Sequence, residues 1–254
     1  MTGLDINLVN QFVNENIVTF HENRLNALTK LSLQRLIRKN PYLFKAKNLN
    51  RASDLIEGLL TAFLSSSEEK IFGDFLEDLA IFISKITSDG RKSSAEGIDL
   101  EFDRNNIRYI ISIKSGPNWG NSSQHKKLAE NFITAKNVLQ QSQFGVNVQP
   151  VLGICYGKTK TSFSKDGYLK TVGQNFWYLI SQKPDLYIDI IEPIGFRAKQ
   201  HNEAFESNRA KISNRFTHEF IDLYCRDDGS INWETLVQYS CGNLDLDSVL
   251  KTLH

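Results

Sequence analysis

Two residues that could take part in phosphodiester hydrolysis lie near each other in the sequence. Asp99 lies in the stretch EGIDLEF, and Lys114 follows fifteen positions later in the apolar run YIISIK. Hydrolysis of a phosphodiester needs carboxylates that hold Mg²⁺ and a cation that positions water and offsets charge on the scissile phosphate. The alternative is structural, because a lysine at a strand end can extend to solvent and an aspartate can simply face water. The pair is a candidate catalytic site whose meaning depends on its surroundings.

The segment after Lys114 has the composition of a site for a phosphate backbone. Gly116, Pro117 and Gly120 allow the chain to approach a ligand closely. The polar residues that follow precede a predicted helix, whose N-terminus favours an anion. We expect DNA contacts from Ser115, Asn118, Trp119, Asn121, Ser122, Ser123 and Gln124. Trp119 has an alternative role as an anchor in the core.

A second basic segment, GKTKTSFSKDGYLK, follows the next apolar run. Lys158, Lys160 and Lys165 alternate there with hydroxyl and aromatic residues. Lysines suit phosphates and hydroxyls suit base edges, so we expect the three lysines to contact DNA. The alternative is an ordinary solvent-exposed loop.

Apolar residues at three- and four-residue intervals predict a helical first third. The helical stretches are residues 6–37, Asp54–Leu64 and Glu68–Ile86. Asn40-Pro41 ends the first of them, because the residue before proline is pushed out of the α region. Ser66 and Ser67 are expected to begin the third.

After residue 90 the apolar period changes to two, which indicates strands. Ile98–Phe102 and Ile107–Ile113 flank the polar turn DRNN and predict a β-hairpin. A predicted helix, Ser122–Gln140, then leads to another apolar run, Val146–Tyr156. Because a helix of this length connects parallel strands, we expect a crossover from strand to helix to strand.

The last part of the sequence contains one strand-like run and two helical ones. Leu186–Ile191 is strand-like, whereas Asn208–Cys225 and Trp233–Tyr239 have helical spacing. The sequence has no repeats and no low-complexity linkers, which favours a single domain over residues 1–254. Its expected parts are a mainly helical part (1–90), a catalytic α/β core (91–195) and a helical C-terminal part (196–254).

Charge, cysteine content and hydropathy indicate which classes of protein the sequence fits. The 30 Lys and Arg against 29 Asp and Glu give a net charge of +1, which neither requires nor excludes a polyanionic partner. The three scattered cysteines do not suit a zinc site or a disulfide framework, so we interpret all three as buried small residues. The sequence has no membrane-spanning run and no signal peptide, so we expect a cytoplasmic protein.

The order of these elements resembles the PD-(D/E)xK nuclease superfamily, which includes most type II restriction endonucleases. The similarity runs from Asn40 to Tyr239, and the closer likeness is to enzymes that cut interrupted GG…CC-type sites. It rests on the segments NPYLFKAKNLN, SIKSGPNWGN, GICYGKTKTSFSKDGYLKTVGQNFWYLI and DGSINW. The resemblance implies an α/β fold with a central mixed sheet flanked by helices. It also implies that Asp99 is the first metal-binding aspartate and Lys114 the motif lysine.

One position departs from the superfamily pattern, because Ser112 stands where Asp or Glu is usual. Serine is a poor ligand for a hard cation, so either another carboxylate completes the site or the site is inactive. The candidates are Glu77, Glu96, Glu101 and Glu130. Helical spacing places Glu77 at the flank of its helix's apolar face, whereas Glu130 lies opposite the apolar face of its own helix. We therefore expect Glu77, ahead of Glu130, to join Asp99.

These observations and the resemblance predict a type II restriction enzyme, a sequence-specific, Mg²⁺-dependent endonuclease that cuts both strands of DNA. We expect it to need no nucleotide cofactor and to bind no membrane. A homodimer is expected, because a two-fold dimer matches a palindromic site. The expected catalytic residues are Asp99, Lys114, Glu77 and Ser112, and the candidate metal ligands are Asp99, Glu77 and Glu130. Two alternatives remain: a repair or junction-resolving nuclease of the same fold, and a DNA-binding module with a decayed site.

Overall fold

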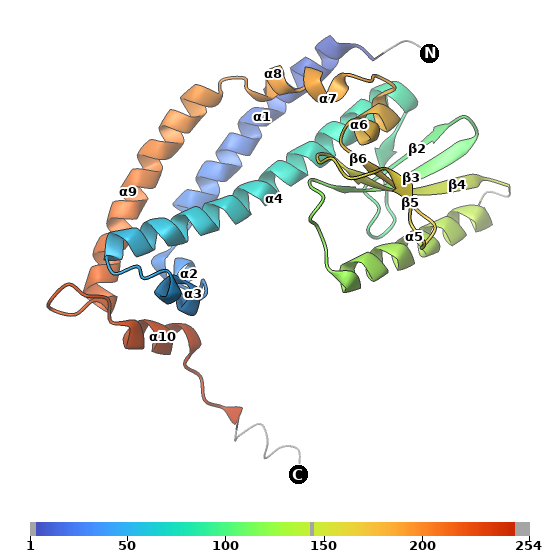
Figure 1. Ribbon diagram of the computed structural model, residues 1–254. Helices are drawn as coiled ribbons and strands as arrows, with labels where there is room; N and C mark the ends of the chain where they lie inside the picture. Colours follow the sequence, from blue (N-terminus) through green and yellow to red (C-terminus); the bar gives the residue numbers. More distant parts are fainter. Residues whose placement is uncertain (1–3, 143–144, 247–254) are drawn as a thin grey trace. The chain divides into compact units, whose positions relative to one another are not determined.

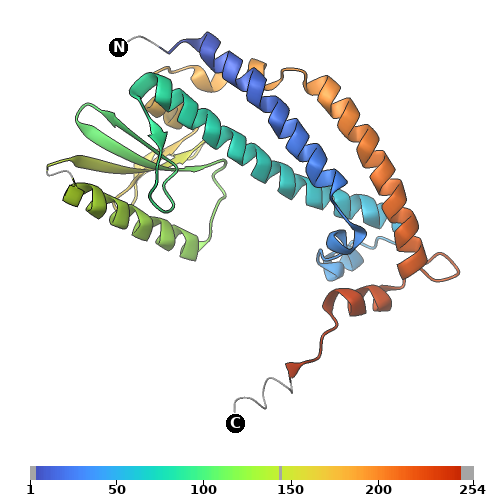
Figure 2. The ribbon, with the colours of Figure 1, turned by 180° about the vertical axis from the view of Figure 1, so that it is seen from behind.

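The computed structural model describes residues 4–142 and 145–246. Two compact units are present, each made from two stretches of chain. The described residues of Met1–His21 and Glu69–Ala198 form the first unit, and those of Glu22–Glu68 and Lys199–His254 form the second. The elements drawn in Figures 1 and 2 are α1 (Ile6–Thr29), α2 (Leu33–Leu36), α3 (Pro41–Ala46), α4 (Ala52–Ser88), β1 (Arg91–Lys92), β2 (Leu100–Arg104), β3 (Ile107–Lys114), α5 (Ser122–Ser142), β4 (Asn147–Ile154), β5 (Ser162–Phe163), β6 (Leu169–Val172), α6 (Gln174–Ser181), α7 (Leu186–Asp189), α8 (Ile191–Ile194), α9 (Ala198–Tyr224) and α10 (Trp233–Cys241).

The first unit is built around a mixed six-stranded sheet with the order β1-β2-β3-β4-β6-β5. β2 and β3 are antiparallel and form the predicted hairpin. Asn105 and Asn106 in its turn have φ values of 53° and 60°. Asparagine tolerates this left-handed conformation better than most residues, which allows a tight connection. β4 runs parallel to β3, so the predicted crossover through α5 is confirmed.

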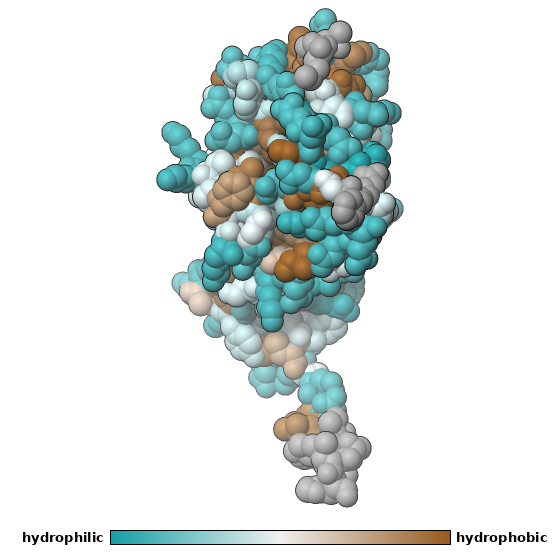
Figure 3. Space-filling model, turned by 90° about the vertical axis from the view of Figure 1, so that its right-hand side faces the viewer, coloured by the Kyte–Doolittle hydropathy of each residue, from teal (hydrophilic) through white to brown (hydrophobic). Residues whose placement is uncertain are grey.

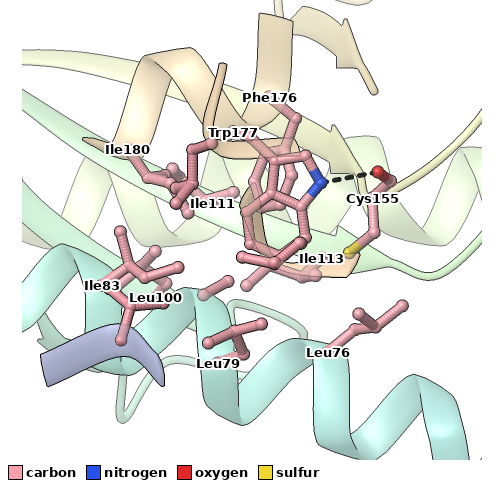
Figure 4. Close-up of a cluster of buried hydrophobic side chains, with 14 of the residues drawn as sticks. Leu76, Leu79, Ile83, Leu100, Ile111, Ile113, Cys155, Phe176, Trp177 and Ile180 are labelled. Atoms are coloured by element: carbon pink, nitrogen blue, oxygen red, sulfur yellow. Dashed lines mark hydrogen bonds between the residues drawn. The ribbon is translucent and has the colours of Figure 1, made fainter. Parts of the chain in front are cut away.

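Helices cover both faces of this sheet. α5 packs on one face through Leu128, Ala129, Phe132 and Ala135. On the other face, α4 and α6 enclose the cluster drawn in Figure 4, which includes Leu76, Leu79, Ile83, Leu100, Ile111, Ile113, Phe176 and Ile180. Trp177 of α6 donates from Nε1 to the carbonyl of Cys155 at 2.8 Å. Burial of each large apolar side chain contributes about 1.5–3 kcal/mol to the stability of the folded state. The expected central mixed sheet flanked by helices is confirmed.

The second unit is helical. Its core combines α2, α3, α9, α10 and the parts of α1 and α4 that belong to it. Phe216 and Phe220 of α9 are among its most deeply buried side chains. Asn40 caps α3 by accepting from the N–H of Leu43 at 3.2 Å, and Asn232 caps α10 in the same way. The helical character predicted for both ends of the chain is therefore confirmed.

One helix of 37 residues, α4, replaces the two helices predicted over Asp54–Leu64 and Glu68–Ile86. Ser66 lies inside this helix and donates from Oγ to the carbonyl of Ala62 at 3.0 Å. Such a bond to the preceding turn satisfies the hydroxyl without ending the helix. The predicted break at the serine pair was therefore wrong.

Two short elements also differ from the sequence prediction. Leu186–Ile191 contributes to the helices α7 and α8 and is not a strand. A short apolar run does not distinguish a strand from a buried helical segment, which explains the error. Strand β6 was not predicted, although it pairs in parallel with β4 and antiparallel with β5.

The compact units cut across the predicted division into parts 1–90, 91–195 and 196–254. Both α1 and α4 contribute residues to both units. Each unit contains its own buried cluster of apolar side chains. A single nuclease domain over residues 1–254 stays a prediction.

The surface is largely hydrophilic on the side that Figure 3 shows, with hydrophobic side chains interspersed. Among the described residues, no helix combines the length and the apolarity needed to cross a membrane. Cys155 is buried, but Cys225 is half-buried and Cys241 is exposed. The prediction that all three cysteines are buried was therefore wrong for two of them.

Candidate active site

Asp99 lies immediately before β2 and is held by the neighbouring strand. Its N–H donates to the carbonyl of Ile111 at 2.8 Å. Its Oδ2 accepts from the N–H of Ile113 at 2.6 Å and from the hydroxyl of Ser112 at 3.3 Å. β3 therefore fixes both the backbone and the carboxylate of Asp99.

Lys114 ends β3 beside this carboxylate. Its Nζ donates to the carbonyl of Ile113 at 2.7 Å and lies 3.7 Å from Oδ2 of Asp99. The same ammonium lies 5.6 Å from the centre of the Trp119 ring, within cation–π range. The Lys114 side chain is 32% exposed, so a ligand in solvent can reach it. The hairpin thus brings together the aspartate and the lysine that the sequence singled out.

Glu77 of α4 belongs to the same electrostatic cluster. Its Oε1 accepts from Nζ of Lys92 at 3.2 Å. Burial raises the pKa of Glu77 above its ordinary value, the charge of Asp99 raises it further, and Lys92 opposes both effects. The hydrogen bond to Glu77 raises the pKa of Lys92 in turn. A second carboxylate therefore lies within electrostatic reach of Asp99, as the helical spacing of α4 indicated.

Asp99 and Glu77 have the chemistry that a hard divalent cation requires. Mg²⁺ is bound in proteins by one or two carboxylates and keeps several waters. The ammonium groups of Lys92 and Lys114 now offset the two negative charges. Within residues 4–142 and 145–246, no group of three or more His, Cys, Asp or Glu side chains is arranged to hold a metal ion. The residues present fit a cation held by a carboxylate pair with water in its remaining positions.

Ser112 is buried in β3, and its hydroxyl bonds to Asp99. A serine here helps to orient the aspartate, whereas an acid would add a negative charge beside it. Ser112 therefore contacts Asp99, and any further carboxylate ligand of a metal must come from another residue.

The other candidate carboxylates line a cavity of about 520 Å³ beside α5. Glu96, Glu101 and Glu130 lie there. Glu101 pairs with Arg91 at 2.8 Å, and Glu96 pairs with Lys127 at 3.2 Å. In the described part of the chain, no hydrogen bond or ion pair joins Glu130 to Asp99 or Lys114. The charge of Asp99 contributes to the raised pKa of Glu77, after burial, whereas Glu130 lies in the cavity beside α5.

The segment between β3 and α5 is fixed by a reciprocal cap. The N–H of Asn121 donates to Oε1 of Gln124 at 2.9 Å, and the N–H of Gln124 donates to Oδ1 of Asn121 at 3.1 Å. This capping box begins α5. The side chains of Asn121 and Gln124, which we expected to contact DNA, therefore form hydrogen bonds within the helix N-terminus. Trp119 is half-buried against the ring of His125, with ring centres 4.5 Å apart. Exposed polar side chains remain at Asn118, Ser122 and Ser123, and Ser115 is half-buried.

The second basic segment leaves the carboxyl end of β4 and includes the edge strand β5. Lys158, Lys160 and Lys165 are all exposed. Among the described residues, none of the three forms an ion pair with an acidic side chain. Their charges are therefore available to a polyanion.

Two residues of this region were not assigned from the sequence. Lys92 forms the ion pair with Glu77, and Tyr156 lies over Gly116. The basic pair in GRKSS, just before the hairpin, was a signal for Lys92, since β1 pairs with β2 beside Asp99. The position of Tyr156 depends on the register of β3 and β4, which no sequence pattern specifies.

Comparison with known families identifies one match. The family model described as type II restriction endonuclease EcoO109I matches residues 7–202, which is more than three quarters of the chain. The match includes α4, the hairpin, α5, the crossover strand and both basic segments. No curated protein matches the chain.

Proposed function

Because the chain belongs to the type II restriction endonuclease EcoO109I family and is thus a sequence-specific DNA endonuclease, we propose that it uses Mg²⁺ to hydrolyse both strands of duplex DNA. One observation carries the metal assignment. Nζ of Lys114 lies 3.7 Å from Oδ2 of Asp99. Burial, and after it the charge of Asp99, raises the pKa of Glu77, which supports assigning this second carboxylate to the same site. Two carboxylates and a lysine are the mixture that phosphodiester hydrolysis requires.

In the proposed mechanism, each residue of the cluster has a separate task. Asp99 and Glu77 would hold Mg²⁺, with Glu130 as the alternative second ligand, and the bound cation would supply polarisation of the scissile phosphate. Lys114 orients the attacking water. Ser112 and the N–H of Ile113 keep the carboxylate of Asp99 in position through their hydrogen bonds to Oδ2.

Lys92 has a proposed role that depends on its ion pair. Its Nζ lies 3.2 Å from Oε1 of Glu77 and offsets the charge of that carboxylate. Its side chain is 68% exposed, so a ligand in solvent can also reach it. We expect Lys92 to add a positive charge close to the DNA phosphates.

DNA is proposed to bind along the two basic segments. Ser115, Asn118, Trp119, Asn121, Ser122, Ser123 and Gln124 would contact the backbone near the scissile phosphate, together with the more distant Lys158, Lys160 and Lys165. Contacts to phosphates position a protein on DNA, whereas contacts to base edges specify sequence. The exposed lysines therefore supply affinity, and neighbouring hydroxyls supply part of the readout.

The expected salt dependence tests the assignment of the lysines. Replacing Lys158, Lys160 and Lys165 by Ala should weaken binding to all DNA sequences. The slope of log affinity against log salt should become less steep by about 0.9 for each phosphate that the variant no longer neutralises. Filter-binding titrations at several salt concentrations measure the slope. The control replaces the same lysines by Arg and should keep the slope, while an unchanged slope in the Ala variant would place this segment away from DNA.

A homodimer is the proposed assembly, with each subunit cutting one strand of a two-fold site. Sedimentation of the purified protein should give twice the subunit mass of 29.0 kDa without DNA. A protein of one subunit mass, both alone and with a cognate duplex, would contradict the dimer. Such a result would favour an enzyme that nicks one strand at a time.

Plasmid digestion with Mg²⁺ tests the proposed activity directly. Discrete fragments that disappear with EDTA are expected. Cleavage restricted to branched or damaged DNA would favour a repair or junction-resolving nuclease. DNA that is retarded in a gel yet stays intact would favour a binding module with a decayed site.

A further inference from the structure

Tyr156 emerges from the sheet directly beside the residues that follow Lys114. The last residue pair between β3 and β4 is Lys114 with Ile154. The pairing continues past both strands, because the N–H of Cys155 donates to the carbonyl of Lys114 at 2.9 Å and the N–H of Tyr156 donates to that of Ser115 at 3.1 Å. Tyr156 is therefore aligned with the start of the segment between β3 and α5.

The Tyr156 side chain lies against Gly116, two residues after Lys114. A Cβ built on Gly116 would lie 2.4 Å from Oη and 2.5 Å from Cζ of Tyr156. The phenol ring thus lies directly over Gly116, where a side chain would displace it.

The segments around this ring are packed closely together. Gly157 has a φ of +123°, and a Cβ there would lie 3.0 Å from Cγ of Pro117. A Cβ on Gly173 would lie 2.7 Å from the carbonyl oxygen of Gly157. Three loops therefore meet at the carboxyl ends of the parallel strands β3, β4 and β6. Ligands of open α/β sheets bind at this end of the strands.

The hydroxyl of Tyr156 lies against Gly116, while the residue as a whole is open to solvent. The residue is 50% exposed. In the part of the chain that the structure describes, no residue forms a hydrogen bond with its Oη. Lys114, which is partly exposed, lies two residues before Gly116, and the exposed Lys158 lies two residues after Tyr156. A phenol that can donate, set among cations, suits an anionic oxygen.

We infer that Tyr156 donates a hydrogen bond from Oη to a non-bridging oxygen of the scissile phosphate and thereby positions it beside Lys114. This inference rests on the proposed nuclease function and adds a substrate-positioning residue to it. Gly116 serves the same contact, since only a residue without a side chain leaves room for the ring. The hydrogen bond holds one phosphate in register with Asp99 and Lys114.

The variant Tyr156→Phe tests the contact, because it keeps the ring over Gly116 and removes only the hydroxyl. After the cleavage site has been mapped with the wild-type protein, the single-turnover rate should fall about 10- to 100-fold, as expected for loss of a hydrogen bond to a charged group. Tyr187→Phe is the matched control. Tyr187 is an exposed phenol on α7 of the same unit, and its loss should leave the rate unchanged.

A chemically altered duplex identifies the phosphate. Binding is measured in EDTA with a neutral methylphosphonate at the scissile position. The wild type and Tyr187→Phe should lose affinity on this duplex, whereas Tyr156→Phe should lose several-fold less. An equal loss in all three proteins, or a normal cleavage rate of Tyr156→Phe, would overturn the inference. A wild-type protein that cuts no DNA would instead contradict the proposed function.

Discussion

Replacing Lys114 by Ala will reduce cleavage to background while binding to specific DNA stays close to that of the wild type. Lys114 Nζ lies 3.7 Å from Asp99 and is partly exposed, so it can reach both the water and the phosphate of a bound substrate. Loss of one preorganised group of this kind costs about 100- to 1000-fold in rate. Binding should survive, because contacts that position DNA are distributed over many groups.

Asp99→Asn should have the same effect through a different cause. The amide oxygen of Asn can still accept from the N–H of Ile113, so the hairpin should keep its structure. The negative charge that holds a cation is lost. Single-turnover cleavage and gel-shift binding measure the two properties separately. Lys127→Ala is the control for charge removal, because Lys127 pairs with Glu96 and not with Asp99. Substantial cleavage by Lys114→Ala would contradict the assignment of the site.

The second large effect is expected for Glu77→Gln, which should lose cleavage and metal affinity but keep its fold and its DNA binding. Burial raises the pKa of Glu77, and the nearby charge of Asp99 raises it further. Removing even a group that only supports a metal ligand costs about 10- to 100-fold in metal affinity or activity, and removal of a ligand should cost at least as much. Calorimetric titration with Mn²⁺ measures the metal affinity.

Glu130→Gln is the matched control for this variant. Both variants remove one carboxylate from a helix, at the half-buried Glu77 and at the exposed Glu130. Glu130, however, lines the cavity beside α5. Normal cleavage by Glu130→Gln with inactive Glu77→Gln is the expected outcome. The reverse pattern would assign the second ligand to Glu130, and a failure of Glu101→Gln alone would assign it to β2.

Glu77→Gln should also leave the protein no less stable at neutral pH. The folded state raises the pKa of Glu77, chiefly through burial, so ionisation of this residue opposes folding. The stabilising effect of the protonated form is present below the ordinary glutamate pKa of about 4.3 and is lost as pH rises through the raised value. The melting temperature of Glu77→Gln relative to wild type should therefore increase from acidic to neutral pH without metal. A decrease would mean that the ion pair with Lys92 outweighs burial.

Much of the first unit could be predicted from the sequence, because its periodicity reports which faces are buried. The change of apolar period after residue 90 located the hairpin, and a helix of α5's length between two apolar runs predicted parallel β3 and β4. These features brought Asp99 and Lys114 together. Helical spacing likewise placed Glu77 at the flank of the buried face of α4.

The errors arose where short-range patterns compete with tertiary packing. The hydroxyl of Ser66 donates to a carbonyl of the same helix, α4. The serine pair therefore resembled a helix cap at a point where no helix begins. Leu186–Ile191 is too short for its period to distinguish strand from helix. The ion pair of Lys92 with Glu77 and the placement of Tyr156 over Gly116 depend on strand register and on neighbours distant in sequence. Such contacts become visible only in the folded chain.

Sequencing the DNA ends that the purified protein produces with Mg²⁺ tests the central claim most directly. The central claim is that the Asp99, Glu77 and Lys114 cluster hydrolyses DNA at one specific sequence. The expected result is that all ends fall at one position within, or beside, a single short sequence with two-fold symmetry, and that Asp99→Asn produces none of them. Ends scattered over unrelated sequences, or equal cutting by Asp99→Asn, would contradict the claim.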